Sequence, residues 1–368
     1  MKLCYLAVGD SIHTKRWLSF FKKRGHDVYL MTSVPGNIGG ITEIDISLRP
    51  FPRTSAYKNL PKIKRILKEI SPDILHSHYV TQYGWAGALA NFHPFVLTGW
   101  GSDMFLEPYR RRLNKFLFGY TARKADLITT ETERGRSAFQ AAGVPKDKIE
   151  LIHWGVDLEL FRPGIDARSL RQELGLGDGP VVFSPRAMKA LFNVETILRA
   201  FPRVLKEFPS AKLVLKGPRS QESKDSFCLE MERIAGELKI GGSIVFQEEV
   251  PYDKMPLYYS AADVVVSIPD SDSMPISVLE GIACGAVPVL SDLPSVREWF
   301  TPGVNAIFPR DKSPESLADS ILTVLKNEPT RNSSREANYS LVREKADHAQ
   351  WMLKMEGLYE GLVGRPSP

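Results

Sequence analysis

The sequence contains few cysteines and no long apolar run. Its 368 residues include three cysteines, which show neither paired spacing nor a histidine cluster beside them. This usage argues against a disulfide framework or a zinc site, and it favours buried thiols in a reducing compartment. No stretch approaches the length of an uninterrupted membrane span, and the apolar start of the chain, MKLCYLAVGD, is too short for a signal peptide. We therefore expect a cytosolic protein.

Two common nucleotide-binding motifs are also missing. A dinucleotide-binding G-x-G-x-x-G needs three glycines after the first strand, and only Gly9 stands there. No G-x-x-x-x-G-K-[ST] occurs, which excludes a P-loop at the level of the motif. The formal net charge of +5 is mildly basic, so composition gives no reason to expect a nucleic-acid partner.

The chain does contain a repeated α/β pattern. Short apolar, β-branched runs alternate with helical segments throughout, which predicts doubly wound parallel sheets. A fresh pattern of this kind begins at Pro180, after a turn-rich stretch, and residues 162–164 (Arg-Pro-Gly) have the composition of a linker. We predict two Rossmann-like domains, residues 1–163 and residues 164–346.

The most informative stretch is ADVVVSIPDSDSMPISVLEGIACGAVPVLSD, residues 262–292. It predicts a buried strand, a polar loop, a helix and a second strand. Pro275 suits the first helical turn, Asp272 or Ser273 suits the N-cap, and Gly285 suits the position after the helix.

Two acids in this stretch, Asp272 and Glu280, suggest a ligand site. Ligands of open α/β sheets bind at the loops after the strands, and a helix N-terminus there favours phosphate. We interpret the unit as a nucleotide-diphosphate site in which the backbone of Met274, Ile276 and Ser277 faces phosphate. Glu280 would accept hydrogen bonds from ribose hydroxyls, and Asp272 from sugar hydroxyls. The simpler alternative is that Asp272 only caps the helix and Glu280 is an exposed carboxylate, and for two acids alone that alternative is favoured.

A resemblance to a known family favours the ligand site over this simpler alternative. LEGIACGAVPVLSD, residues 279–292, resembles the acidic signature of retaining GT-B glycosyltransferases, specifically family four (glycosyl transferases group 1). There, two carboxylates separated by seven residues precede an Ala-Cys-Gly and a Pro-Val strand. Here Asp272 replaces the usual first glutamate, and Ser-Met-Pro replaces the common Gly-Phe-Gly. PDILHSH, the strand ending in WGSD and GVDLELFRP also match in type and order, so the resemblance spans nearly the full chain.

The resemblance implies a GT-B fold whose two domains face a central cleft. It also implies that a last helix, at about residues 347–368, crosses back to the first domain. The implied activity is retaining, metal-independent transfer from a nucleotide-diphosphate sugar, with a UDP-sugar favoured and no cofactor. The acceptor would be a glycan, a lipid-linked molecule or a small molecule, in the synthesis of cell-surface polysaccharide or glycoconjugate.

Candidate residues follow from position and from the resemblance together. Arg186 comes directly after a strand, where its planar fork can bind diphosphate oxygens, and Lys189 is the nearest second cation although it is out of register with the relatives' lysine. The expected catalytic residues are Arg186, Lys189, Asp272 and Asp103. The expected donor-binding residues are Glu280, Ser273, Met274, Pro275, Ile276, Ser277, Val250 and Gly217. The expected acceptor-side residues are Gly9, Asp10, His13, His78, Gly84 and Trp100, where Trp100 stands in the place of a histidine that many relatives carry.

Other interpretations stay open at this stage. Three alternatives are a GT-B sugar-nucleotide epimerase, an inactive partner-binding homologue, and a Rossmann-type interaction protein without a ligand.

The sequence also contains two basic clusters, each with two interpretations. They are residues 110–112 and the set Lys58, Lys62, Lys64, Arg65 and Lys68. A solvated helix face is slightly preferred for the second set, and attraction to an anionic membrane surface or to phosphate-bearing acceptors is the alternative.

Overall fold

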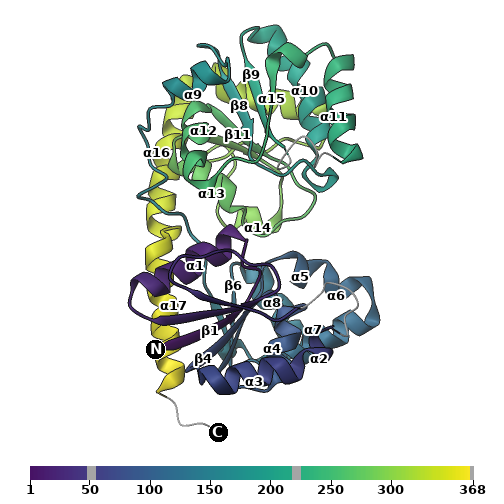
Figure 1. Cartoon of the computed structure of the whole chain (residues 1–368). Helices are drawn as coiled ribbons and strands as arrows, with labels where there is room; N and C mark the ends of the chain where they lie inside the picture. The colour runs from purple at the N-terminus through teal and green to yellow at the C-terminus, as the bar shows by residue number, and fades with distance from the viewer. Residues whose placement is uncertain (48–54, 218–224, 365–368) are drawn as a thin grey trace. The chain divides into compact units, whose positions relative to one another are not determined.

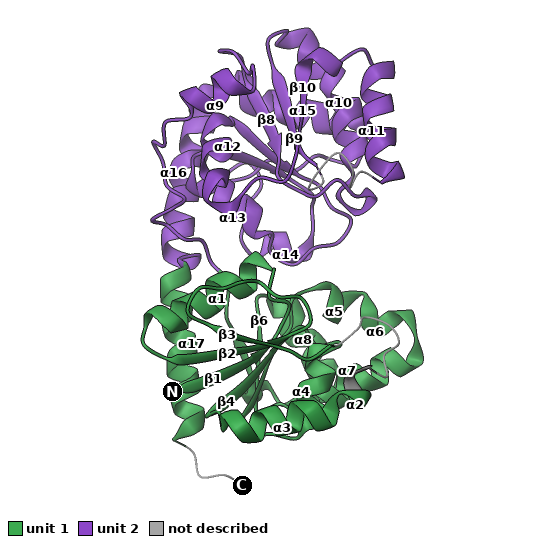
Figure 2. Cartoon of the chain, viewed as in Figure 1, with its two compact units in different colours: residues 1–154, 348–368 green, residues 155–347 purple. Residues whose placement is uncertain are grey.

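The computed structural model describes residues 1–47, 55–217 and 225–364. The chain divides into two compact units (Figure 2). Unit 1 comprises Met1–Trp154 and His348–Pro368, and unit 2 comprises Gly155–Asp347. Among the described residues, no helix combines the length and the apolar character needed to cross a membrane.

Unit 1 is built on a seven-stranded sheet in the order β3-β2-β1-β4-β5-β6-β7. Every neighbouring pair of strands is parallel. The strands are β1 (Lys2–Leu6), β2 (Asp27–Thr32), β3 (Thr42–Asp45), β4 (Ile74–His78), β5 (Phe95–Thr98), β6 (Leu127–Thr130) and β7 (Ile149–Leu151). The edge strand β3 was not expected from the sequence, because TEID lacks the apolar run that marks the buried strands.

Helices cover both faces of this sheet, as alternate side chains of β1 show. Cys4 and Leu6 pack in the core beneath α3 and α4, whereas the hydroxyl of Tyr5 lies 3.1 Å from that of Tyr359 on α17. The helices of unit 1 are α1 (Ile12–Lys23), α2 (Ser55–Lys58), α3 (Leu60–Ile70), α4 (Tyr83–Ala90), α5 (Ser102–Phe105), α6 (Glu107–Arg110), α7 (Arg112–Lys124), α8 (Glu133–Ala141) and α17 (His348–Val363), with a 3-10 turn η1 (Lys146–Lys148) (Figure 1). The last residues expected in the crossover helix, 365–368, lie outside the described residues.

Unit 2 is built on a five-stranded parallel sheet in the order β10-β9-β8-β11-β12. Its strands are β8 (Val181–Ser184), β9 (Lys212–Lys216), β10 (Ile244–Gln247), β11 (Val264–Ser267) and β12 (Val287–Leu290). Its helices are α9 (Arg168–Glu173), α10 (Val194–Glu207), α11 (Ser226–Glu237), α12 (Met255–Ala261), α13 (Ile276–Ala283), α14 (Pro294–Arg297), α15 (Pro314–Lys326) and α16 (Glu328–Lys345), with 3-10 turns η2 (Ala190–Phe192), η4 (Gly241–Ser243) and η5 (Tyr252–Lys254).

The inner strand β11 shows why this sheet is doubly wound. Val264 and Val266 belong to the core formed with α10, α11 and α15. Val265 faces the opposite side, where α13 approaches so closely that a Cβ on Gly281 would lie 2.8 Å from a methyl group of Val265. The predicted α/β class and parallel sheets are confirmed in both units.

The division between the units falls at Gly155, nearer the N-terminus than the expected linker at residues 162–164. The intervening segment packs into unit 2. The backbone N–H of Val156 donates to the carbonyl of Ala346, and the buried ring of Phe161 lies 6.0 Å from that of Tyr259. These contacts attach the segment that precedes residues 162–164 to the second core.

Candidate functional site

The loop and helix that the sequence singled out lie at the carboxyl end of β11. Helix α13 begins at Ile276, and its N-cap residue is Pro275. The expected N-cap was therefore wrong, since the carboxylate of Asp272 accepts instead from the backbone N–H of Ser273 at 2.9 Å. The expected helix end agrees with the structure, because Gly285 follows the C-cap with a φ of 97°.

Asp272 forms an ion pair with Arg186, which follows β8. The guanidinium Nη2 lies 2.7 Å from Oδ2 of Asp272, and both side chains are about four-fifths buried or more. A second guanidinium nitrogen lies 3.4 Å from the hydroxyl of Ser277 in the first turn of α13, and the ring of Phe192 packs against the guanidinium at 4.3 Å. Burial raises the pKa of the Asp272 carboxyl, while Arg186 acts in the opposite direction. The arrangement holds a planar cation beside the free N–H groups of a helix N-terminus.

Asp270, which shares a D-x-D spacing with Asp272, points elsewhere. Its carboxylate pairs with Lys312 and accepts from the amide of Asn193 at 3.0 Å. These contacts lower the pKa of Asp270, chiefly through Lys312. The two acids therefore have separate partners and do not converge on one point.

Glu280 is buried inside α13 and is not the exposed carboxylate of the simpler alternative. Its side chain is about 5% exposed, and its Oε2 accepts from the hydroxyl of Tyr259 on α12 at 3.2 Å. Burial raises the pKa of Tyr259 well above its usual value, and the nearby Glu280 adds to this effect. The phenol therefore keeps its proton and stays a hydrogen-bond donor.

Lys216 is a cation of this site that the sequence analysis missed. It ends β9 and is half-buried, and burial lowers its pKa, while the nearby Glu249 and Glu280 act in the opposite direction and Arg186 adds a smaller lowering. Its position just before Gly217, at the end of a buried strand, was the signal available in the sequence. By contrast, Lys189 is exposed and only precedes the 3-10 turn η2.

The remaining donor-side candidates are mostly buried. Val250, Met274 and Ser273 are each less than 8% exposed, and no described residue hydrogen-bonds the hydroxyl of Ser273. The backbone N–H of Gly217 donates to the carbonyl of Gln247, so this residue ties the ends of β9 and β10 together.

In unit 1, Asp103 organises the loops after β4 and β5. The side chain has no exposed surface, and its oxygens accept from the backbone N–H groups of Val80 at 2.8 Å, Gly101 at 2.7 Å and Trp100 at 3.1 Å. Burial raises the pKa of Asp103, against the effect of these bonds. The carboxylate therefore holds the two loops in position, and its catalytic role stays a prediction.

Three expected acceptor-side residues come together at the carboxyl ends of β1, β4 and β5. The ring of His13 lies 5.7 Å from that of Trp100, and the ring of His78 lies 6.0 Å from the same indole. Trp154, which the sequence analysis did not nominate, packs against all three. Burial lowers the pKa of His78 to about 3, so this imidazole is neutral at neutral pH.

Two other acceptor-side candidates, Gly9 and Gly84, lie where another part of the backbone approaches closely. A Cβ on Gly9 would lie 2.6 Å from the carbonyl of Val34, and one on Gly84 would lie 2.9 Å from the carbonyl of Tyr79. Both positions therefore require glycine for close packing. Asp10 is partly exposed beside Gly9.

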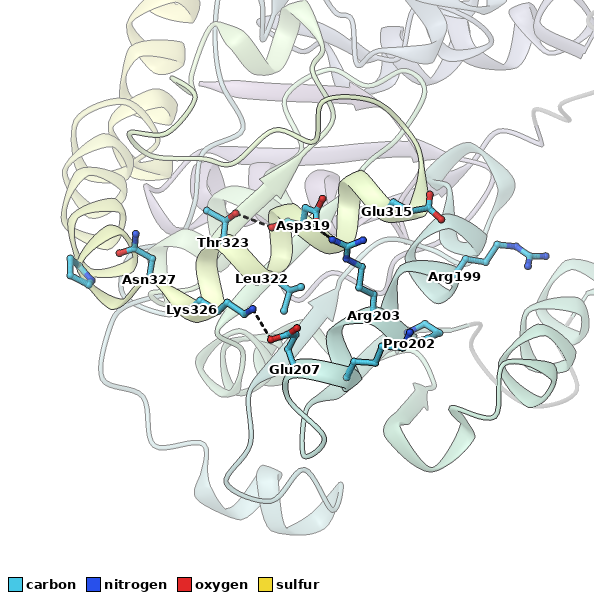
Figure 3. Close-up of a pocket in the computed structure, with 12 residues that line it drawn as sticks. Arg199, Pro202, Arg203, Glu207, Glu315, Asp319, Leu322, Thr323, Lys326 and Asn327 are labelled. Atoms are coloured by element: carbon cyan, nitrogen blue, oxygen red, sulfur yellow. Dashed lines mark hydrogen bonds and ion pairs between the residues drawn. The ribbon is translucent and has the colours of Figure 1, made fainter.

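A hollow of about 1010 Å³ lies in unit 2 between α10 and α15, and none of the expected site residues lines it (Figure 3). Two of its cations pair with carboxylates: Arg203 with Asp319 at 2.5 Å, and Lys326 with Glu207 at 2.7 Å. Because these charges already neutralise one another, we do not assign the donor site to this hollow. Among the described residues, no group of three or more His, Cys, Asp or Glu side chains could hold a metal ion.

Two family models match the chain. The model described as "Glycosyl transferase 4-like" matches residues 2–132, and the one described as "Glycosyl transferases group 1" matches residues 166–341. The two matches lie within units 1 and 2 respectively.

Curated relatives match over part of their length. A GDP-mannose-dependent alpha-(1-6)-phosphatidylinositol monomannoside mannosyltransferase of Mycolicibacterium smegmatis is 30% identical over 45% of this chain and 44% of its own. A D-inositol 3-phosphate glycosyltransferase of Frankia alni is 28% identical over 54% of this chain and 50% of its own. An alpha-monoglucosyldiacylglycerol synthase of Streptococcus pneumoniae is 26% identical over 77% of this chain and 67% of its own. The matched part of the chain thus spans about half the length of the first two relatives.

Solved structures show the same fold. HepE of Anabaena, in complex with UDP-glucose, has a TM-score of 0.83 at 16% identity and covers 98% of this chain and 100% of its own. Sucrose-phosphate synthase of Thermosynechococcus elongatus has a TM-score of 0.80 at 19% identity and covers 98% of this chain and 99% of its own. With two parallel-sheet units that each match a glycosyltransferase model, the chain has the GT-B fold and belongs to the glycosyltransferases that these two models describe.

Proposed function

We propose that the chain transfers a sugar, with retention of anomeric configuration, from a nucleotide-diphosphate sugar held by unit 2. One observation carries the proposal. Arg186 follows β8 and lies beside Ser277 in the first turn of α13, and Lys216 ends the neighbouring strand β9, while Asp272 and Glu280 supply acceptors next to these cations. Cations and helix N–H groups bind a diphosphate, and carboxylates bind sugar hydroxyls.

The ion pair between Arg186 and Asp272 suggests how the donor is bound. A diphosphate carries more negative charge than one carboxylate and matches the guanidinium fork, so it competes with Asp272 for Arg186. The released carboxylate would then accept hydrogen bonds from the donor sugar. In this proposal Arg186 links diphosphate binding to sugar binding.

Lys216 takes the second cationic role that the sequence analysis gave to Lys189. A partly buried ammonium stabilises the developing charge of the departing diphosphate more strongly than an exposed one, because the surrounding dielectric is lower. Glu280 would accept from ribose hydroxyls and is oriented by the hydroxyl of Tyr259. We propose that these protein cations serve in place of a metal ion and that no cofactor takes part.

The donor and acceptor follow from chemistry and from the relatives. UDP-sugars are the first candidates, since HepE was solved with UDP and with UDP-glucose, and GDP-mannose is the second, since it is named for the mycobacterial relative. The names of the curated relatives contain phosphatidylinositol monomannoside, D-inositol 3-phosphate and monoglucosyldiacylglycerol, which supports a lipid-linked, glycan or small hydroxylated acceptor on the unit 1 side, in cell-surface glycoconjugate synthesis. All three cysteines are buried and free, which supports action in the reducing cytoplasm.

Calorimetry with UDP, GDP, ADP, dTDP and their sugars tests the proposal. We expect selective binding of one nucleotide, which is unchanged by EDTA and weakened by about tenfold or more in Glu280→Ala, where a buried acceptor is lost. Arg203→Ala, in the hollow of Figure 3, is the matched control and should bind as wild type does. No binding by any nucleotide would favour an inactive homologue.

Product analysis tests the chemistry itself. Once a donor is found, the anomeric configuration of the product, read by NMR, should equal that of the donor. An inverted product would contradict retention. Rapid conversion of the donor to another sugar nucleotide without any acceptor would identify an epimerase instead.

A further inference from the structure

The short helices α6 and α7 expose large apolar side chains. The exposed fractions are 71% for Tyr109, 57% for Leu113 and 63% for Phe116. Side chains of this kind normally lie in cores, and a contiguous exposed group of them marks a surface that contacts something. Single exposed apolar residues elsewhere in the chain need no such explanation.

Cations surround these three side chains. Arg110, Arg111, Arg112 and Lys115 are all exposed in the same segment. A single acid, Glu107, lies between residues 106 and 124, and it pairs with Arg110 at 2.7 Å. Among the described residues, no carboxylate forms an ion pair with Arg111, Arg112 or Lys115. The surface is therefore both apolar and positively charged.

A hollow of about 430 Å³ adjoins this surface. Tyr109 and Phe116 form part of its apolar lining, and Arg112, Lys115 and Arg123 contribute cations. Small residues of α8 such as Ala138 complete it. A hollow lined by both apolar and basic side chains has the chemistry to take an anionic lipid head group together with the start of its acyl chains.

We propose that this surface, residues 109–116 with the adjoining hollow, docks unit 1 on an anionic lipid bilayer. Lys and Arg side chains near a membrane surface are attracted by anionic lipids, and exposed Tyr, Leu and Phe side chains insert at the head-group level. The charge of the surface is complementary to such a membrane, and its apolar group is complementary to the interface beneath the head groups. This inference is independent of the donor site in unit 2.

The basic residues of α3, by contrast, have no large exposed apolar side chain on the same helix. On α3 the apolar residues Ile63, Ile66, Leu67 and Ile70 are all buried in the core. Arg65 lies near Glu69 at 3.6 Å. This helix presents charge without apolar groups, so it provides a matched control within the same unit.

Vesicle co-sedimentation of the full chain tests the proposal. We expect binding to vesicles that contain phosphatidylglycerol, weak binding to phosphatidylcholine vesicles, and release by salt. The triple variant Arg110→Gln, Arg111→Gln, Arg112→Gln should lose affinity by about a hundredfold. The control triple variant Lys64→Gln, Arg65→Gln, Lys68→Gln removes the same charge from α3 and should bind nearly as wild type does.

A second variant separates insertion from simple charge attraction. Leu113→Ser with Phe116→Ser keeps every cation and should still lose membrane affinity, because its inserting groups are gone. Phe116→Trp should gain fluorescence that brominated phosphatidylglycerol quenches. Equal losses in the two triple variants, undiminished binding of the serine variant, no vesicle binding at all, or tighter binding to a mixed-sequence oligonucleotide than to vesicles would each overturn the proposal.

Discussion

The two units place opposite chemistry at the carboxyl ends of their parallel sheets. Unit 2 gathers charged groups there, namely Arg186, Lys216, Asp272 and Glu280. Unit 1 gathers neutral aromatic rings, with His78 enclosed by Trp17, Trp100 and Trp154 and held uncharged by burial. The same topology therefore carries a cluster of charged side chains in one unit and an aromatic cluster in the other. The difference arises from the few residues that follow each strand.

The sharpest test of this contrast removes the central cation of unit 2. Arg186→Ala should lower kcat/KM by about a hundredfold to a thousandfold, because it removes charge stabilisation at the departing diphosphate. Donor binding and initial rates provide the measurement, with Arg203→Ala as the control. A thermal melt would confirm folding, since the variant leaves Asp272 without its ion-pair partner. Near-normal turnover by a folded Arg186→Ala would contradict the site.

The next test asks which lysine belongs to the charged site. Lys216→Ala should lower kcat/KM by about tenfold to a hundredfold, because a partly buried ammonium beside the diphosphate is lost. Lys189→Ala changes an exposed side chain and should have less than about a twofold effect. Parallel kinetic assays of the two variants decide the question, and the reverse ranking would restore the assignment made from the sequence.

This pair of lysines illustrates what the sequence could and could not predict. The two α/β sheets were predictable because buried runs such as β11 are apolar on both faces, and Arg186 was predictable because it directly follows such a run. Lys216 was missed because its nearness to Glu280 and Arg186 depends on the pairing of β8 with β9, which spacing along the chain does not reveal. The predicted N-cap of α13 was wrong for a related reason, because Asp272 pairs with Arg186, which lies far away in the sequence.

The neutral cluster of unit 1 can be tested through pH. Burial lowers the pKa of His78 to about 3, so between the unfolded value near 6.5 and pH 3 the unfolded chain binds one more proton at this site. Stability from this group is therefore complete above about pH 6.5 and is lost as the pH falls toward 3. His78→Phe should reduce the slope of unfolding free energy against pH by about 1.4 kcal/mol per pH unit in that window. Urea unfolding at several pH values measures it.

A neighbouring histidine supplies the control for that experiment. His76 lies two residues earlier on β4, and its ring nitrogens bond the hydroxyls of Tyr359 and Thr98. No described residue bonds either ring nitrogen of His78. At neutral pH, His76→Phe should therefore destabilise the protein by about 1–3 kcal/mol, while His78→Phe should cost little. Equal destabilisation by the two changes would contradict the description of His78 as an apolar ring.

The smallest expected effect concerns Tyr259, whose hydroxyl donates to Glu280. Tyr259→Phe removes the donor to Glu280 while keeping the buried ring, so it should cost about 0.5–1.5 kcal/mol of stability. If Glu280 binds ribose hydroxyls, the same change should weaken nucleoside diphosphates by a few-fold, because the carboxylate is less firmly oriented. Calorimetry with the nucleoside diphosphate and with inorganic pyrophosphate separates the two effects. Pyrophosphate lacks the ribose, so its affinity should not change. Equal weakening of both ligands would show that Tyr259 acts on the diphosphate end of the site, and Glu280 would then lose its assignment to the ribose.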